Sequence, residues 1–337
     1  MKYTSAQTVS QNTWEPQLKK LRHREIKPSQ RESIGFSAVF GYLSPNMMSH
    51  EIQNYLFLSL TIEEKKLQKN KLRRAIALKT KEFASKEGKK QEEITKEEHG
   101  QIKDFVETEM LKGIAPDEYY INAFIDTQNK LLFVDVSSIS KVERLVEWLN
   151  RIDSEFIVRP FFDSSLEIYL TSWLYKPTEQ MPRSLQMDHE ATLKHDNKSK
   201  AVFSNQDLES DELITLLNHD KRVMELALVR DGRLKFKLKS DGSIRKLKPT
   251  DILKGEIERA ENPTSMIQDI EADWIMMTNE LTQLYQWFEG IFDVNNPSAP
   301  GSDSNNESRE EAAHSQITST KKVEEDSAAE LDTLNFS

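Results

Sequence analysis

Lysine and arginine alternate with large apolar residues in one short segment of this chain of 337 residues. From Arg233 to Lys239 the odd-numbered positions are basic, while Leu234, Phe236 and Leu238 occupy the even ones. Because successive side chains of a β-strand point to opposite faces, the pattern predicts a strand with an apolar core face and four cations in a row on the other. Closely spaced like charges repel one another unless anions neutralise them, so this row indicates contact with a polyanion.

More cations surround this strand. Two Asp-Gly turns, at Asp231 and Asp241, separate three alternating segments and predict an antiparallel meander. Residues 230–248 hold eight basic and two acidic residues, in a chain whose formal net charge is −10. A lysine-rich edge strand that discourages aggregation is the alternative interpretation. We expect the following residues to form a cationic plate: Arg230, Arg233, Lys235, Lys237, Lys239, Arg245, Lys246 and Lys248.

A second basic segment lies much earlier in the chain. Residues 65–90 contain eleven Lys and Arg against two Glu, whereas a solvated helix usually mixes signs at i,i+4 spacing. Two basic segments in an acidic chain indicate a nucleic-acid partner, recognised through its phosphates. Zinc-finger, RNP and clear helix-turn-helix patterns are missing from the sequence, which predicts binding with little preference for base sequence.

Enzyme signatures are weak. The sequence has no Walker loop and no GxGxxG, and the absence of cysteine excludes a thiolate nucleophile or zinc ligand. Glu63-Glu64-Lys65 imitates the acidic-x-Lys end of a nuclease strand, but the upstream Asp that a metal site would need is missing, since the first Asp is Asp104. We expect no catalytic activity, no metal and no cofactor, with a DNA-end-processing enzyme as the least favoured alternative.

Strands and helices that would position these residues follow from hydrophobic periodicity. Residues 53–62 predict a buried strand, and amphipathic helices over 63–86 and 95–111, separated at Gly88, predict a helical hairpin that projects from the body. Further along the chain, the patterns predict strands at 120–126, 131–136, 156–159 and 166–170, a helix opened by a Ser140–Glu143 capping box, a polar loop at 178–204, and helices at 208–217 and 272–291. This mixture predicts an α+β fold with antiparallel sheets and packed helices.

The last 43 positions have a composition of their own. Residues 295–337 carry nine acidic and three basic residues and few large apolar ones, so we expect a disordered acidic tail. Its end, Glu330–Ser337, is a candidate docking peptide for a partner or an intramolecular screen over the basic surface.

The expected organisation is a central α+β region (1–62 and 113–177), a hairpin lobe (63–112), a C-terminal α+β region (178–294) and the tail (295–337). With no apolar run near the roughly 18 residues that span a bilayer and no signal core, we expect a cytoplasmic protein with no membrane partner.

An ordered set of segments resembles the RdgC family, the recombination-associated proteins of proteobacteria. The set spans residues 50–291 and comprises Glu63–Lys65, Ile125–Asp126 with Leu131–Asp135, Ile168–Trp173, Gln206–Leu208, Leu226–Leu228, Asp241-Gly-Ser-Ile-Arg-Lys-Leu-Lys248 and Asp273–Leu281. The resemblance implies a non-catalytic protein that binds duplex and single-stranded DNA with little sequence preference. It further implies a homodimeric ring that encircles duplex DNA, is associated with the nucleoid and restrains RecA-promoted strand exchange.

The resemblance also implies which residues contact DNA. The cationic plate would touch the backbone, helped by Lys69, Arg73 and Arg74 on the hairpin and by Lys198, Lys200 and Gln206. Two segments depart from the family pattern: Val202–Asn205 is neutral where relatives carry a basic cluster, and Gly113–Tyr120 replaces a Leu-Pro-x-Ala-Phe segment tied to ring closure, with Tyr119 or Tyr120 as its substitute. A protein-interaction scaffold of the same fold with weak DNA affinity is therefore the rival function.

Overall fold

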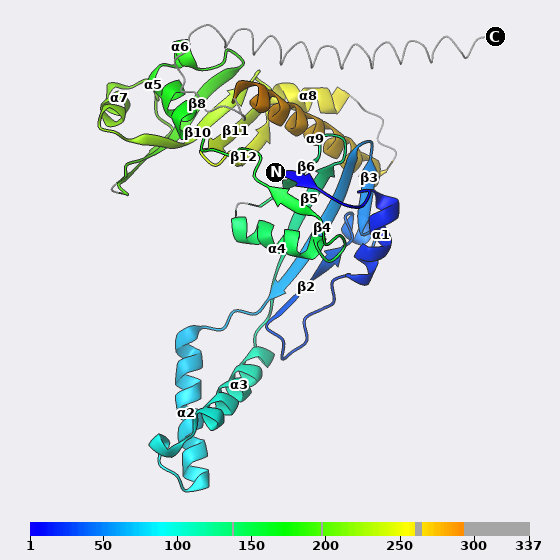
Figure 1. Ribbon diagram of the computed structural model, residues 1–337, viewed down its shortest axis with the longest axis vertical. Coiled ribbons are helices and arrows are strands. Elements are labelled where there is room, and N and C mark those ends of the chain that lie inside the picture. The colour runs from blue at the N-terminus through cyan, green and yellow to red at the C-terminus, as the bar shows by residue number, and fades with distance from the viewer. Residues whose placement is uncertain (137, 197, 260–264, 293–337) are drawn as a thin grey trace, which may run out of the picture. The chain divides into compact units, whose positions relative to one another are not determined.

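The computed structural model describes residues 1–136, 138–196, 198–259 and 265–292 (Figure 1). Contacts divide the chain into two compact units, one over Met1–Arg159 and one that begins at Pro160. Each unit holds one antiparallel sheet with helices packed on it, which confirms the predicted α+β class. Across the described ranges, no helix combines the length and apolar character needed to cross a bilayer. The predicted disordered tail lies outside the described residues.

The first unit is built on a seven-stranded sheet. Its strands pair in the order β2-β4-β5-β6-β1-β7, and β3 pairs with Tyr55–Leu58 of β4, on the same edge that β2 occupies at Ser59–Glu64. The ladder between β4 and β5 runs over ten residue pairs, from Tyr55↔Asp126 to Glu64↔Asp117, and forms the centre of the sheet. The strands are β1 (Lys2–Thr4), β2 (Glu32–Ser37), β3 (Ser49–Ile52), β4 (Tyr55–Glu64), β5 (Asp117–Asp126), β6 (Leu131–Val134) and β7 (Ile157–Arg159).

Two helices contribute to the core of this unit, α1 (Gln11–Lys20) and α4 (Ile139–Leu149), and a short 3-10 turn spans Gly41–Leu43. Trp14 of α1 and Leu145 of α4 are fully buried with the apolar side chains of β4. The aromatic ring of Phe156 stacks on Tyr3 at 5.0 Å and meets Trp14 edge-on at 5.5 Å. The predicted Ser140–Glu143 capping box is wrong, because the N-cap of α4 is Ser138, two residues earlier, and it makes no side-chain cap bond.

The predicted helical hairpin is confirmed between β4 and β5. It consists of α2 (Lys69–Glu87), a short 3-10 turn (Gln91–Glu93) and α3 (Lys96–Lys112). Gly88 ends α2 in the left-handed region with φ 65°, which glycine adopts without a Cβ penalty. Thr95 and Glu98 form a reciprocal capping box that starts α3. The predicted helix start at Glu63 is wrong, because β4 continues to Glu64 before the chain turns into α2.

The second unit is built on a five-stranded antiparallel sheet in the order β12-β11-β10-β8-β9. Three of its strands form the predicted meander, and their turns fall at Gly232 and Gly242, both with positive φ. The predicted loop over 178–204 is wrong, because most of it forms the hairpin of β8 and β9. The strands are β8 (Leu185–Lys194), β9 (Lys200–Ser204), β10 (Arg222–Arg230), β11 (Leu234–Lys239) and β12 (Ile244–Pro249).

Helices cover one face of this sheet. The ring of Phe288 on α9 lies 6.2 Å from Phe236 of β11, and Trp173 of α5 stacks on Phe292 at 5.4 Å. The strand predicted at 166–170 is wrong: Leu166, Leu170 and Trp173 are buried at helical spacing and belong to α5 and its N-terminal cap. The helices are α5 (Glu167–Tyr175), α6 (Pro177–Gln180), α7 (Asp211–Asn218), α8 (Asp251–Arg259) and α9 (Met266–Ile291).

Candidate nucleic-acid interface

Strand β11 has the two faces that its alternation predicts. Leu234, Phe236 and Leu238 are fully buried on the side of α9. Lys235 and Lys237 therefore point to the opposite face, which we call the open face of the second sheet. This face also receives side chains from β12, where Lys248 lies opposite Lys235 and Arg245 lies opposite Lys237.

Two lysines of the open face, Lys235 and Lys237, are paired with carboxylates of the same sheet. Lys235 Nζ lies 2.8 Å from a carboxylate oxygen of Asp188, and Lys237 contacts both Glu190 and, at 3.5 Å, Glu225. Asp188 and Glu190 belong to β8, so both lysines reach across the intervening strand β10. The anion that neutralises this row of lysines is thus part of the chain itself.

Glu190 is the centre of this arrangement. Lys246 Nζ approaches its two carboxylate oxygens at 3.1 and 3.2 Å, and Lys237 also contacts Oε2 of the same carboxylate. The hydrogen bonds from Lys237 and then Lys246 hold the pKa of Glu190 below its ordinary value, because they favour the charged form. At the neighbouring position, Arg245 Nη1 lies 4.0 Å from Glu225, which Lys237 also contacts.

The remaining plate residues differ in their surroundings. Lys239 pairs with Asp241 at 2.6 Å. The prediction that Arg233 shares a face with Lys235 and Lys237 is wrong, because Arg233 precedes β11 and donates to Glu280 of α9, on the covered side of the sheet, at 2.5 and 3.1 Å. Lys248, at the end of β12, is exposed and makes no ion pair within the described ranges. The interface predicted from sequence therefore contains both paired and unpaired cations.

Arg230 does not lie with the other plate residues. Its side chain is on the core side of β10, only 7% exposed, with the guanidinium 5.1 Å from the centre of the Trp287 ring. Burial lowers its pKa, and Asp231 at 3.3 Å partly compensates. The prediction of Arg230 as a surface contact is wrong, because its strand position faces α9 and not the open face.

The other contacts predicted in this unit lie at its β8–β9 hairpin. Lys198 follows β8 in the turn, with φ 68°, and Lys200 opens β9 opposite Lys194. Gln206 follows β9 and bonds through its backbone to His189. The side chains of Lys198, Lys200 and Gln206 are exposed. Lys198 and Lys200 have no ion-pair partner in the part of the chain that the structure describes.

The base of the helical hairpin uses two of its cations for structure. Lys65 is 5% exposed, and its ammonium donates to the carbonyl oxygens of Pro28 at 2.8 Å and Leu111 at 3.1 Å. Lys66 pairs with Asp117 at 2.9 Å, at the start of β5. These contacts fix the point where the chain leaves and re-enters the sheet. They also place the lysine of the nuclease-like Glu63-Glu64-Lys65 segment inside the protein.

The start of α2 carries a group of cations without ion-pair partners among the described residues. Lys69, Lys71, Arg73 and Arg74 fall within its first six residues and are exposed, and none makes an ion pair with another described residue. The first turn of α2 has no acidic residue. Positive charge at a helix N-terminus is unfavourable, because the N-terminal end of the helix dipole is itself positive. This cluster, the α2 cation cluster, is therefore destabilising unless an anion binds there.

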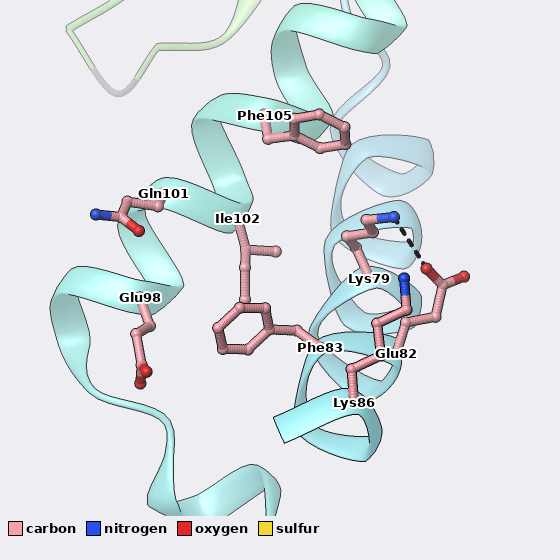
Figure 2. A pocket seen from close by; sticks show the side chains of 8 residues that line it. All are labelled: Lys79, Glu82, Phe83, Lys86, Glu98, Gln101, Ile102 and Phe105. Carbon is pink, nitrogen blue, oxygen red and sulfur yellow. Dashed lines mark hydrogen bonds and ion pairs between the residues drawn. The ribbon is translucent and has the colours of Figure 1, made fainter. Parts of the chain in front are cut away.

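Further along the hairpin, an apolar seam with a hollow of about 250 Å³ separates α2 from α3 (Figure 2). Phe83 and Ile102 meet in this seam, and Phe105 lies above them, as Figure 2 shows. Lys79 pairs with Glu82 at 3.0 Å and lies 5.4 Å from the centre of the Phe105 ring. Its charge is thus engaged within the hairpin, unlike the charges of the α2 cation cluster.

The sequence was compared with protein-family models and with curated proteins. A family model described as "Putative exonuclease, RdgC" matches residues 1–294. The chain belongs to the RdgC family. Three similar curated proteins are each named "Recombination-associated protein RdgC". The one from Shewanella loihica is 28% identical over 79% of this chain and 88% of its own length, that from Pseudoalteromonas translucida 27% over 87% and 96%, and that from Pasteurella multocida 28% over 78% and 86%.

This RdgC-family chain keeps two tyrosines on β5, where its sequence departs from the family pattern. The ammonium of Lys141 lies 4.0 Å from the centre of the Tyr119 ring and covers it. Tyr120 is 53% exposed, and its hydroxyl donates to Glu118 at 2.8 Å. Of the two tyrosines, Tyr120 has the more exposed aromatic ring.

Sequence reasoning missed the carboxylates of the open face. Residues 185–194 alternate apolar and polar side chains, with Gln186, Asp188, Glu190 and Thr192 on the polar positions. This period-2 signal identifies a strand, and only His189 interrupts its apolar side. The missed strand supplies two of the anions that determine how many cations of the plate are unpaired.

Proposed function

We propose that this protein binds DNA through its phosphate backbone without sequence preference and thereby modulates homologous recombination. The observation that carries the proposal is the α2 cation cluster. Four cations gather within the first six residues of α2, two of them, Lys69 and Lys71, in the first turn where the helix dipole opposes them, and the described carboxylates do not pair with them. A bound polyanion removes both the mutual repulsion and the unfavourable dipole interaction.

The spacing of the cluster suits a nucleic acid. Residues 69–74 rise about 7.5 Å along the helix axis, while duplex DNA presents one charge per roughly 1.7 Å of its own axis. Lys69, Arg73 and Arg74 can therefore face neighbouring phosphates without reading a base. Lys248, Lys198, Lys200 and Gln206 provide further exposed contacts in the second unit. Single-stranded DNA offers the same phosphates and is part of the proposal.

Recombination enters through the family. The curated relatives carry the name "Recombination-associated protein", and a protein that occupies DNA without base preference limits access of a strand-exchange protein of the RecA type. We extend the proposal to a homodimeric ring around duplex DNA, associated with the nucleoid. Light scattering of the protein with and without DNA counts the subunits and tests this extension.

Binding is tested by fluorescence anisotropy with two unrelated 30-base-pair duplexes and a single strand across a salt series. We expect equal affinity for both duplexes and a steep log–log salt slope. Arg73→Ala with Arg74→Ala should reduce that slope by about 1.8, since each phosphate contact contributes roughly 0.9. Lys112→Ala is the matched control, because Lys112 lies on the same hairpin but is already paired with Glu109 at 2.5 Å. No binding at low salt would refute the proposal.

Two other functions have specific support. The paired cations of the open face suit a protein-interaction scaffold with weak DNA affinity. The family model's description names an exonuclease, and Mg²⁺-dependent degradation of end-labelled duplex tests that activity directly. We propose a non-catalytic role, and release of labelled nucleotides that survives stringent purification and scales with protein concentration would overturn it.

A further inference from the structure

Strand β8 contains an irregularity opposite the lysines of β11. Leu226 of β10 pairs with Ala191 and Leu228 pairs with Met187, so three residues of β8 stand opposite the single residue Ala227. Extra residues in one strand bend it and re-aim its side chains. Here the extra residues include both Asp188 and Glu190.

The small side chain of Ala227 completes this geometry. In the ladder of β10 with β11, Ala227 lies directly opposite Lys237, and Val229 lies opposite Lys235. Lys237 can lie flat over the Ala227 methyl and reach Glu190, because no larger side chain stands between them. Lys237 and Asp188 are each only 14% exposed in their side chains, so these pairs are held in place more firmly than those between freely moving surface side chains.

We propose that Asp188 and Glu190 act as resident counter-anions on a polyanion-binding face, which DNA phosphates occupy only by exchanging with them. This inference rests on the proposed DNA binding and adds its regulation. Lys235, Lys237 and Lys246 each present an ammonium with three donors, which can donate to a phosphate oxygen in place of a carboxylate oxygen. The carboxylates lower the affinity twice, by occupying the lysines and by repelling the incoming phosphate. Their presence keeps binding reversible on a face that carries many cations.

The experiment is the salt-dependent affinity of the full chain for a 30-base-pair duplex. Glu190→Gln keeps the size of the side chain, releases Lys246 and leaves Lys237 with only its 3.5 Å contact to Glu225. We expect roughly tenfold tighter binding at 50 mM salt and a log–log slope steeper by about 1.8, as for two added phosphate contacts. Glu209→Gln is the matched control, because it removes the same charge from an exposed residue of the same unit that makes no ion pair within the described ranges.

A double-mutant cycle separates exchange from a general gain of charge. Lys237→Met should change the affinity of the wild-type protein little, since Lys237 is engaged with carboxylates. The same substitution in the Glu190→Gln background should remove about half of the gained slope. Asp188→Asn, which releases Lys235, provides an independent variant should Glu190→Gln fail to fold, and circular dichroism checks each variant.

The outcomes are distinct for the two proposals. If the wild type binds DNA and Glu190→Gln matches the Glu209→Gln control, the exchange inference fails and the proposed function stands. If neither the wild type nor the released variants bind, both fail. Tight binding by the released variants alone, with none by the wild type, supports the masked surface and refutes DNA binding as the function of the native chain.

Discussion

The ammonium of Lys235 lies 2.8 Å from the carboxylate of Asp188, although a complete strand, β10, runs between the strands that carry them. Pairs on adjacent strands are the usual unit of sheet stabilisation, so a contact over two strand spacings needs a long lysine stem and an unobstructed path. Both are present here. The number of unpaired cations on β11 therefore depends on β8, which is separated from β11 in the sequence by β9, α7 and β10.

Reversing charge at the start of α2 should raise stability while it weakens DNA binding. We expect Lys69→Glu and Lys71→Glu each to stabilise the hairpin by about 0.3–1 kcal/mol, because an acidic residue favours the positive end of the helix dipole. Thermal unfolding measures this, and anisotropy measures the loss of DNA affinity. Lys86→Glu is the control with the opposite sign, since Lys86 lies in the last turn, where a cation is favourable. Equal effects of the substitutions at both ends would contradict the dipole argument.

Alanine at Gly242 should destabilise the second unit strongly. Its φ is 75°, and a Cβ there would lie 2.2 Å from Cδ2 of the buried Phe162 ring. The left-handed backbone costs about 1–2 kcal/mol and the overpacking about 1–3 kcal/mol, so we expect a loss of about 2–5 kcal/mol in urea unfolding. Gly232→Ala has a similar φ but meets only Ile252 Cδ1 at 3.4 Å, and should cost about 1–2 kcal/mol.

The hairpin should lose a stabilising interaction in strong acid. The hydrogen bond from Lys89, followed by that from the Thr95 backbone, lowers the pKa of Glu98 from 4.5 to about 2. A carboxyl whose pKa is lower in the folded state stabilises it above pH 4.5, and this contribution is lost as the pH falls toward 2. A carboxyl titration by NMR checks the value. Glu98→Gln should abolish the pH dependence of α3, whereas Glu97→Gln, in the same turn, should retain it.

Removing residues 295–337 should strengthen DNA binding. This segment carries a net charge of −6, which repels phosphates near the protein. We expect tighter binding of the 1–294 chain at low salt and a difference that disappears at high salt, because salt screens charges more than about 10 Å apart. A full-length chain with the tail's Asp and Glu changed to Asn and Gln should behave like the truncated one. If only truncation has an effect, length and not charge is responsible.

Periodicity predicted most of the elements that carry the candidate interface. The alternation of β11 and its two Asp-Gly turns identify the meander from local residues alone, and Gly88 and Thr95 identify the ends of the two hairpin helices. These features are local, so one sequence suffices to find them. The family resemblance is borne out as well, since the RdgC model matches residues 1–294.

Other features depend on contacts between distant segments. Leu166, Ile168 and Leu170 alternate as in a strand, but burial of Trp173 and Leu174 with Leu166 and Leu170 selects a helix. The neutralisation of the plate could not be predicted, because it requires the strand order that brings β8 within reach of β11. The burial of Arg230 also depends on a distant segment, because the position of α9 shows that the side of β10 that carries Arg230 is the core side.

The insertion of the hairpin between two paired strands bears on how the chain folds. Glu64 and Asp117 are directly opposed, yet residues 65–116 separate them in sequence. Closing so long a loop costs conformational entropy before any pairing is gained. Helical hairpins form from local contacts on fast timescales, so α2 and α3 can fold first and bring their two ends together. The hairpin, which carries the proposed DNA contacts, would then also speed the pairing of β4 with β5 in the correct register.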